Sequence, residues 1–140
     1  MSTLAILLFF AASVPASLDA VKAEQDLEKR SELALDYGKK VLKDARTSYD
    51  SGNLDQVKSM VQDVREAVRV CLQSLEDTKK NPRRKSKYFK RAEIKTREMM
   101  RDADALSEHM SYVDRSVLDP LRKDLHEAND ELLRGIMGMK

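Results

Sequence analysis

Apolar and small residues recur every three or four positions over most of the chain, and this spacing predicts helices rather than strands. The pattern is clearest between residues 89 and 110, where the steps alternate between three and four. The residues of this seam are Phe89, Ala92, Thr96, Met99, Ala103, Leu106 and Met110. Such a heptad-like seam is typical of helices that pack at shallow angles, as in coiled coils and bundles.

Three further segments carry an apolar face of the same kind. The first is formed by Leu27, Ala34, Val41, Leu42, Ala45 and Tyr49. The second is formed by Val57, Met60, Val61, Val64, Ala67, Val68, Cys71 and Leu75. The last of the three follows the seam already described and is formed by Leu121, Leu125, Ala128 and Leu132. The patterns together predict four amphipathic helices.

The residues between these segments predict where each helix stops and starts. Gly52 can take the positive φ of a helix stop, and Asn53 can cap the second helix with Gln56 three residues later. The sequence Asn81-Pro82 predicts a turn before the third helix. Asp119 is expected to cap the fourth helix, with Pro120 at its first position, and Gly135 and Gly138 to end it.

Four amphipathic helices joined by short loops predict an all-α fold, an antiparallel four-helix bundle that occupies residues 21–140 as one domain. The composition agrees, with 36% charged residues, 41% hydrophobic ones, four Gly and three Pro. In this up-down-up-down arrangement, the start of the third helix is expected beside the start of the first.

The N-terminal residues 1–20 have the pattern of a secretory signal peptide. An apolar run from Leu4 to Val14 is followed by Pro15 and small residues, which permits cleavage after Ala16 or Ala20. The run is shorter than the roughly 20 apolar residues of a membrane span. We therefore expect a periplasmic or secreted protein. The alternative is an uncleaved short anchor, since the first three residues carry no Lys or Arg.

The sequence shows no motif for catalysis, and neither an enzymatic activity nor a cofactor is predicted. Cys71 is alone and falls on an apolar face, which indicates a buried thiol. His109 and His126 lie on different helices, and neither has a recognisable carboxylate partner. A copper site would join one of them to Met99, Met110, Met137 or Met139, but methionines at this spacing more often fill a core.

Positive charge is concentrated between residues 79 and 97, where ten Lys and Arg residues accompany one acid, Glu93. The whole chain has a net charge of only +2, so any role of this charge is local. Lys87, Arg91 and Lys95 are four residues apart and repel one another, and Lys87 lies near a helix N-terminus, which disfavours cations. The candidate residues for binding an anion or a partner are Arg83, Arg84, Lys87, Lys90, Arg91 and Lys95.

A second interpretation leaves these cations without an external ligand. They could instead form an internal lattice of ion pairs with acids at the start of the first helix. The acids expected to take part are Glu24, Asp26, Glu28 and Glu32. From the sequence, both interpretations remain open.

Two stretches resemble known proteins. "YDSGNLDQV" resembles the hinge of a tetratricopeptide repeat at Tyr49, Gly52, Asn53, Asp55 and Val57, but no second copy follows at a 34-residue period. The stretch from "NPRR" through "FKRAEIKTRE" is similar to helical exported bacterial proteins of unassigned function. The second resemblance implies export and a helical fold without implying an activity.

The expected function is therefore that of a non-enzymatic exported interaction protein, which binds an anionic surface or polymer or an acidic protein. Membrane association would be peripheral at most. The alternative is a scaffold that pairs with another helical protein through Tyr88, Ile94 and Met100. Nucleic-acid binding is compatible with the local charge, but the predicted export argues against it.

Overall fold

The computed structural model describes residues 14–139, and this part of the chain folds into helices with no strand. Four long helices are present: α2 (Leu27–Asp50), α3 (Leu54–Asp77), α4 (Lys87–His109) and α5 (Asp119–Met137). A short helix α1 (Leu18–Ala23) precedes them, and a 3-10 helix η1 (Arg115–Leu118) leads into α5. The predicted all-α helical bundle is thus confirmed. Most of the expected signal peptide, residues 1–13, lies outside the described residues.

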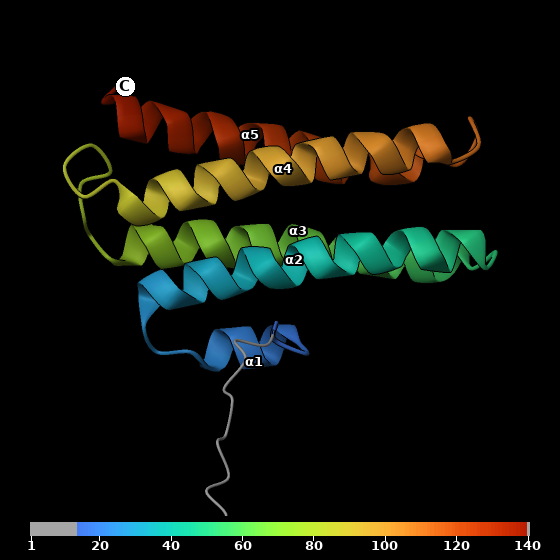
Figure 1. Ribbon diagram of the computed structural model, residues 1–140, viewed down its shortest axis with the longest axis horizontal. Helices are drawn as coiled ribbons and strands as arrows, with labels where there is room; N and C mark the ends of the chain where they lie inside the picture. Colours follow the sequence, from blue (N-terminus) through green and yellow to red (C-terminus); the bar gives the residue numbers. More distant parts are fainter. Residues whose placement is uncertain (1–13, 140) are drawn as a thin grey trace, which may run out of the picture.

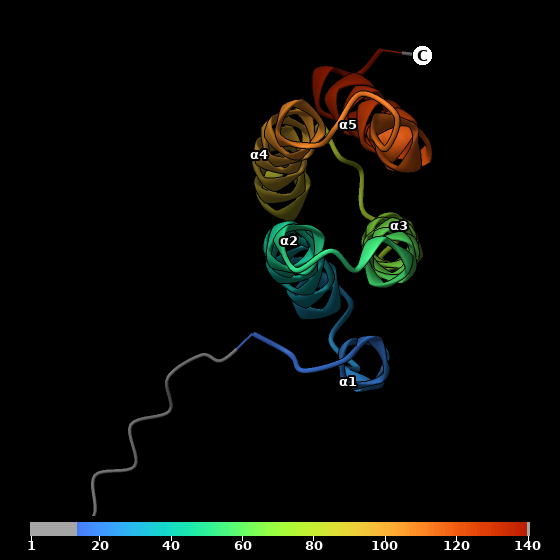
Figure 2. The same ribbon diagram turned by 90° about the vertical axis from the view of Figure 1, so that its right-hand side faces the viewer.

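The long helices form two antiparallel hairpins, α2–α3 and α4–α5, which stack so that α2 lies beside α4 and α3 beside α5 (Figures 1 and 2). Contacts between the hairpins join residues 59 positions apart. They include Arg91 with Glu32 across α2 and α4, and Arg65 with Asp124 across α3 and α5. Because the separation in sequence is the same in both contacts, α2 is parallel to α4 and α3 is parallel to α5, and the two hairpins are in register. The start of the third long helix therefore lies beside the start of the first, as predicted.

The predicted apolar faces form the core. Every residue of the seam from Phe89 to Met110 is buried, and Phe89, the most exposed of them, is 8% exposed. The four residues predicted for α5 are also buried, and the core continues through α2 and α3. Tyr49 and Met60 are only partly buried and pack on the edge of the core, and Leu27, also predicted for the apolar face of α2, is only partly buried. The periodicity of the sequence thus identified the buried face of each long helix.

One polar contact lies within the interface between α4 and α5. Asn129 Nδ2 donates to Glu93 Oε1 at 3.2 Å, and both side chains are buried. Arg97 Nε lies 3.3 Å from the same Glu93 oxygen. Because a buried carboxylate needs such partners, this contact favours one register of α4 against α5. The single acid of the basic segment is therefore engaged inside the bundle.

The helix boundaries follow the sequence signals at the first loop but not at α5. Asn53 Oδ1 accepts a hydrogen bond from Gln56 N at 3.0 Å, and Gly52 has a φ of 79°, as predicted. The prediction that Asp119 caps the last helix is wrong, because Leu118 occupies the N-cap position. The 3-10 helix η1 continues directly into α5, so Asp119 already has the helical angles φ −57° and ψ −44°. Pro120 follows it within the first turn.

Helix α1 was not predicted. Ser17 Oγ caps it by accepting a hydrogen bond from Ala20 N at 3.2 Å, and Val21 is fully buried. The helix packs on the side of the α2–α3 hairpin that faces away from the α4–α5 hairpin (Figure 1). A boundary between residues 20 and 21 would fall within α1. Six residues are too few to show a helical period, which explains why the pattern missed it.

Candidate functional site

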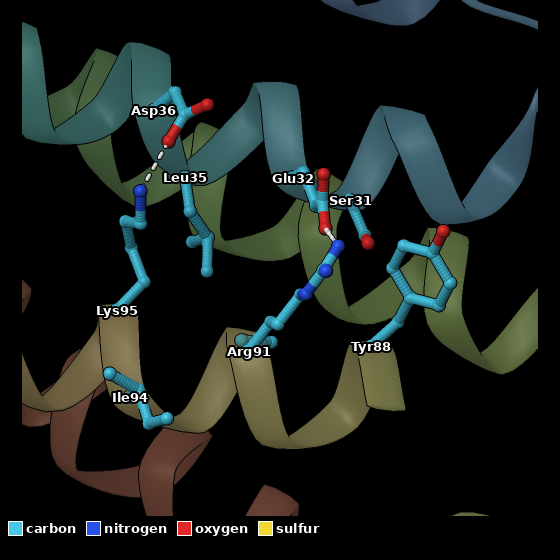
Figure 3. A pocket seen from close by; sticks show the side chains of 9 residues that line it. Ser31, Glu32, Leu35, Asp36, Tyr88, Arg91, Ile94 and Lys95 are labelled. Atoms are coloured by element: carbon cyan, nitrogen blue, oxygen red, sulfur yellow. Dashed lines mark hydrogen bonds and ion pairs between the residues drawn. The ribbon is translucent and has the colours of Figure 1, made fainter. Parts of the chain in front are cut away.

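The six candidate cations divide into two groups, and the first group is paired with acids of a neighbouring helix. Arg91 donates to Glu32 Oε1 at 2.6 Å, and Lys95 donates to Asp36 Oδ1 at 2.5 Å. Both side chains reach from α4 toward α2 (Figure 3). The hydrogen bond and the charge of Glu32 raise the pKa of Arg91. These two cations therefore belong to an ion-pair lattice between parallel helices.

The lattice uses some of the expected acids and one that was not expected. Glu28 pairs with Lys80, and Glu32 pairs with Arg91 as described. Asp26 instead caps α2 by accepting from Lys29 N at 3.1 Å, and Glu24 lies 3.7 Å from Lys29 Nζ. Asp36 takes part because residues 28, 32 and 36 are four apart and share the face of α2 that meets α4.

A groove of about 370 Å³ separates α2 from α4 at these ion pairs. Leu35, Tyr88 and Ile94 contribute apolar surface to it, and the two pairs cross it (Figure 3). The charged groups that could orient a small ligand are thus already engaged with one another. The groove is better described as part of the interface between the hairpins than as a ligand site.

The second group consists of Arg83, Arg84, Lys87 and Lys90. All four side chains are exposed, and none forms an ion pair with another residue between 14 and 139. Lys85, also exposed, lies between them in the sequence. We call the surface formed by Arg83, Arg84, Lys85, Lys87 and Lys90 the basic end.

Asn81 organises the turn that carries the first part of the basic end. Its Oδ1 atom accepts from Arg83 N at 2.9 Å and from Arg84 N at 3.4 Å. Its carbonyl oxygen accepts from Lys85 N at 2.8 Å. These bonds close one helix-like turn, which fixes the backbone from which three cationic side chains project. The predicted turn at Asn81-Pro82 is confirmed.

The start of α4 is electrostatically unfavourable as it stands. Ser86 occupies the N-cap position but makes no side-chain capping bond, and no acidic residue lies in the first turn. Lys87 and Lys90 place positive charge where the helix dipole is also positive. The Tyr88 ring, 5.4 Å from Lys87 Nζ, offers a weak cation–π contact as partial compensation. An external anion would relieve this repulsion.

Close packing brings the end of α5 against the same turn. A Cβ atom at Gly135 would lie 3.2 Å from the Pro82 ring, and one at Gly138 would lie 2.8 Å from Arg83 Cδ. The side chain of Arg83 therefore crosses the C-terminal end of α5, where a cation is favoured by the helix dipole. From the sequence, both glycines were interpreted as helix ends; this is confirmed for Gly138, the C-cap residue, and wrong for Gly135, which lies within α5.

The opposite end of the bundle contains a contact between a histidine and an aspartate that the sequence did not indicate. His109 Nε2 lies 2.5 Å from Asp50 Oδ1, and Arg46 Nη2 lies 3.4 Å from His109 Nδ1. The expectation that His109 lacks a carboxylate partner is therefore wrong. The partner was hidden because α2 and α4 end side by side although their last residues are far apart in sequence.

Two of the methionines considered for metal binding, and the single cysteine, are part of the core. Met99 and Met110 are buried in the core, and Cys71 is buried with its pKa raised to about 12 by the loss of solvent. Within residues 14–139, no cluster of three or more His, Cys, Asp or Glu side chains is placed to hold a metal ion.

Helices α1 to α5, the part of the chain that the structure describes, include none with the length and apolar character that a membrane span needs. Comparisons with protein-family models, curated proteins and solved structures gave no match to the chain. The geometry of the basic end is therefore the main indication of what the protein binds.

Proposed function

We propose that the protein is a non-enzymatic exported helical-bundle protein that binds an anionic partner through the basic end. The observation that carries this proposal is the contrast between neighbouring cations. Arg91 and Lys95 each face an acid of α2, whereas Arg83, Arg84, Lys87 and Lys90 face solvent without one. Internal ion pairing accounts for the first group and for none of the second, in which Arg83 packs on the end of α5.

The chemistry of the basic end favours phosphate or a similar oxyanion as the bound group. Arg83 and Arg84 can each present a planar fork of donors to two anionic oxygens, and Lys87 and Lys90 add point charges. Because these side chains are exposed, each contact is weak and screened by salt. Several contacts together would give a moderate affinity that falls as the ionic strength rises.

Export is part of the proposal, and it rests on the apolar run from Leu4 to Val14 and the small residues after it. It would bring the basic end into contact with the anionic polymers and lipids of a cell envelope.

The alternative function is a scaffold that pairs with another helical protein. It is favoured by the pairing of Arg91 and Lys95 within the bundle and by two apolar side chains at the opposite end. Tyr112 is 86% exposed and Val113 is 83% exposed on the corner between α4 and η1. Of the residues expected to mediate such pairing, Tyr88 and Met100 pack partly against the core, and Ile94 remains 48% exposed.

Elution from immobilised heparin in a salt gradient tests the proposal. The variant R83Q/R84Q/K87Q/K90Q should elute at a clearly lower salt concentration than the wild type and still unfold near the wild-type melting temperature. A matched control, K40Q/K43Q/K58Q/K123Q, removes four exposed charges elsewhere and should shift elution much less. Equal shifts in both variants would show a response to net charge alone and would contradict a specific basic end.

A further inference from the structure

Exposed apolar side chains gather beside the basic end. Leu133 is 37% exposed, Met137 is 62% exposed and Met139 is 59% exposed, all at the C-terminal end of α5. Ile94, on α4, is 48% exposed but lines the groove between α2 and α4. Tyr112 and Val113 are exposed at the opposite end, but only at this end do exposed apolar side chains lie next to a cluster of unpaired cations among the described residues.

The packing of α5 places these side chains next to the cations. Pro82 and Arg83 contact Gly135 and Gly138, so the last turn of α5 lies directly against the basic turn. The contact of Asn129 with Glu93 sets the antiparallel register of α4 and α5. Since residue numbers rise along one helix as they fall along the other, this register places Leu133 across from the first turn of α4. Figure 1 shows the start of α4 and the end of α5 at the same end of the bundle.

The end of α5 holds its methionines by a defined backbone structure. Met139 N donates to Arg134 O at 2.9 Å, and Gly138 N donates to Gly135 O at 3.2 Å. Gly138 has a φ of 69°, so these bonds form a Schellman motif. In such a motif the residue after the glycine commonly packs on its own helix, yet Met139 remains mostly exposed. The exposure of the two methionines is thus a property of an ordered helix end.

Cations and exposed apolar side chains on one surface are the combination that binds an anionic lipid bilayer. Lys and Arg interact with the phosphate groups, while apolar side chains enter the layer beneath them. A soluble anionic polymer would engage the cations and offer the methionines no apolar environment. An acidic protein could cover both kinds of side chain, and the vesicle experiment below distinguishes it from a bilayer.

We propose that the basic end docks on an anionic phospholipid surface. Leu133, Met137 and Met139 insert into the interfacial layer, and the cations of the basic end lie at the level of the phosphates. The inference rests on the proposed anion binding and adds the identity of the partner. It remains consistent with peripheral association, because the inserted surface is a helix end.

Vesicle binding and heparin elution, measured in parallel, test this inference. The variant L133S/M137S/M139S should bind vesicles of phosphatidylglycerol and phosphatidylcholine at least about tenfold more weakly than the wild type, and elute from heparin unchanged. Circular dichroism melts establish that the variant is folded. Vesicle binding within about twofold of the wild type would overturn the insertion while leaving anion binding intact. Heparin binding by the wild type without vesicle binding would also overturn it, in favour of a polymer or an acidic protein.

A fluorescent probe gives a second readout that does not depend on affinity. Met137→Cys, labelled with an environment-sensitive dye, should show a blue-shifted emission when anionic vesicles are added. The buried Cys71 does not compete for the label. Tyr112→Cys, labelled at the opposite end of the bundle, should show no shift. A shift at Tyr112, or at neither site, would contradict docking through the basic end.

Discussion

The guanidinium of Arg91 donates a hydrogen bond to the carboxylate of Glu32 over 2.6 Å, from α4 to the parallel helix α2. This contact marks the point along α4 at which the cations begin to form ion pairs. Cations from Arg91 onward face acids of α2 or α4, and exposed cations before it, from Arg83 to Lys90, face solvent. The internal lattice that the sequence left open is thus present for Arg91 and Lys95, and binding of an external anion is our proposal for the preceding part of the segment.

Truncation of the core tests the helix assignment. Leu125 is fully buried, so Leu125→Ala should lower the free energy of unfolding by about 2–5 kcal/mol. Leu106→Ala should have an effect in the same range, because Leu106 is also buried. Leu133→Ala, on the exposed face of α5, is the control and should change stability little. Urea denaturation measures all three, and a negligible effect at Leu125 would mean that the wrong face of α5 has been assigned to the core.

The sequence predicted the long helices and their buried faces because each has enough turns to repeat its apolar spacing. It could not predict which helices are neighbours, since α2 contacts α4 through residues 59 positions away. For that reason Asp36 was missed as the partner of Lys95, and Asp50 as the partner of His109. The proximity of Gly138 to Arg83 was hidden for the same reason, because it depends on how α5 packs on the turn.

The pair of Lys39 and Glu98, joined at 2.7 Å, predicts a dependence of stability on pH. The hydrogen bond from Lys39 lowers the pKa of Glu98 below its ordinary 4.5, so the unfolded chain binds the proton more readily. The stabilisation is therefore present above pH 4.5 and is lost as the pH falls below it. The hydrogen bond to Glu98 also raises the pKa of Lys39 above its ordinary 10.5. The stabilisation that charged Lys39 contributes is therefore present below pH 10.5 and is lost as the pH rises above it.

Thermal melts of the wild type and Glu98→Gln measure this contribution. The wild type should be slightly more stable near neutral pH, and the difference should shrink toward zero as the pH falls from about 5 to about 3. Glu108→Gln, at an exposed glutamate without an ion pair within residues 14–139, is the control and should show a smaller difference. A difference between the wild type and Glu98→Gln that grows at acid pH would have the wrong sign for this explanation.

Cys71 should be unreactive in the folded protein. It is buried, and the loss of solvent raises its pKa to about 12, so the reactive thiolate is scarce at neutral pH. We expect alkylation by iodoacetamide at about pH 8 to be at least about 100-fold slower in the folded protein than in denaturant. Similar rates in the two conditions would show that the interface around Cys71 opens readily.

The position of the mature N-terminus tests the proposed export. We expect cleavage after Ala16, because the new chain would begin at Ser17 and keep α1 whole. Cleavage after Ala20 would remove the Ser17 cap and place a charged amino group on the fully buried Val21. N-terminal sequencing of protein recovered from the envelope and the medium distinguishes these sites. Recovery with Met1 intact would argue against export with cleavage.

Two charge-matched variants of α4 test the central claim most directly. Each of K87Q/K90Q and R91Q/K95Q removes two positive charges from the same helix, and their binding to anionic vesicles is measured with their melting temperatures. K87Q/K90Q should bind more weakly and melt at or slightly above the wild-type temperature, because it relieves repulsion at the start of α4. R91Q/K95Q should bind nearly as well as the wild type and melt at a lower temperature, because Glu32 and Asp36 lose their partners. The reverse pattern, with weaker binding only in R91Q/K95Q, would contradict the assignment of anion binding to the basic end.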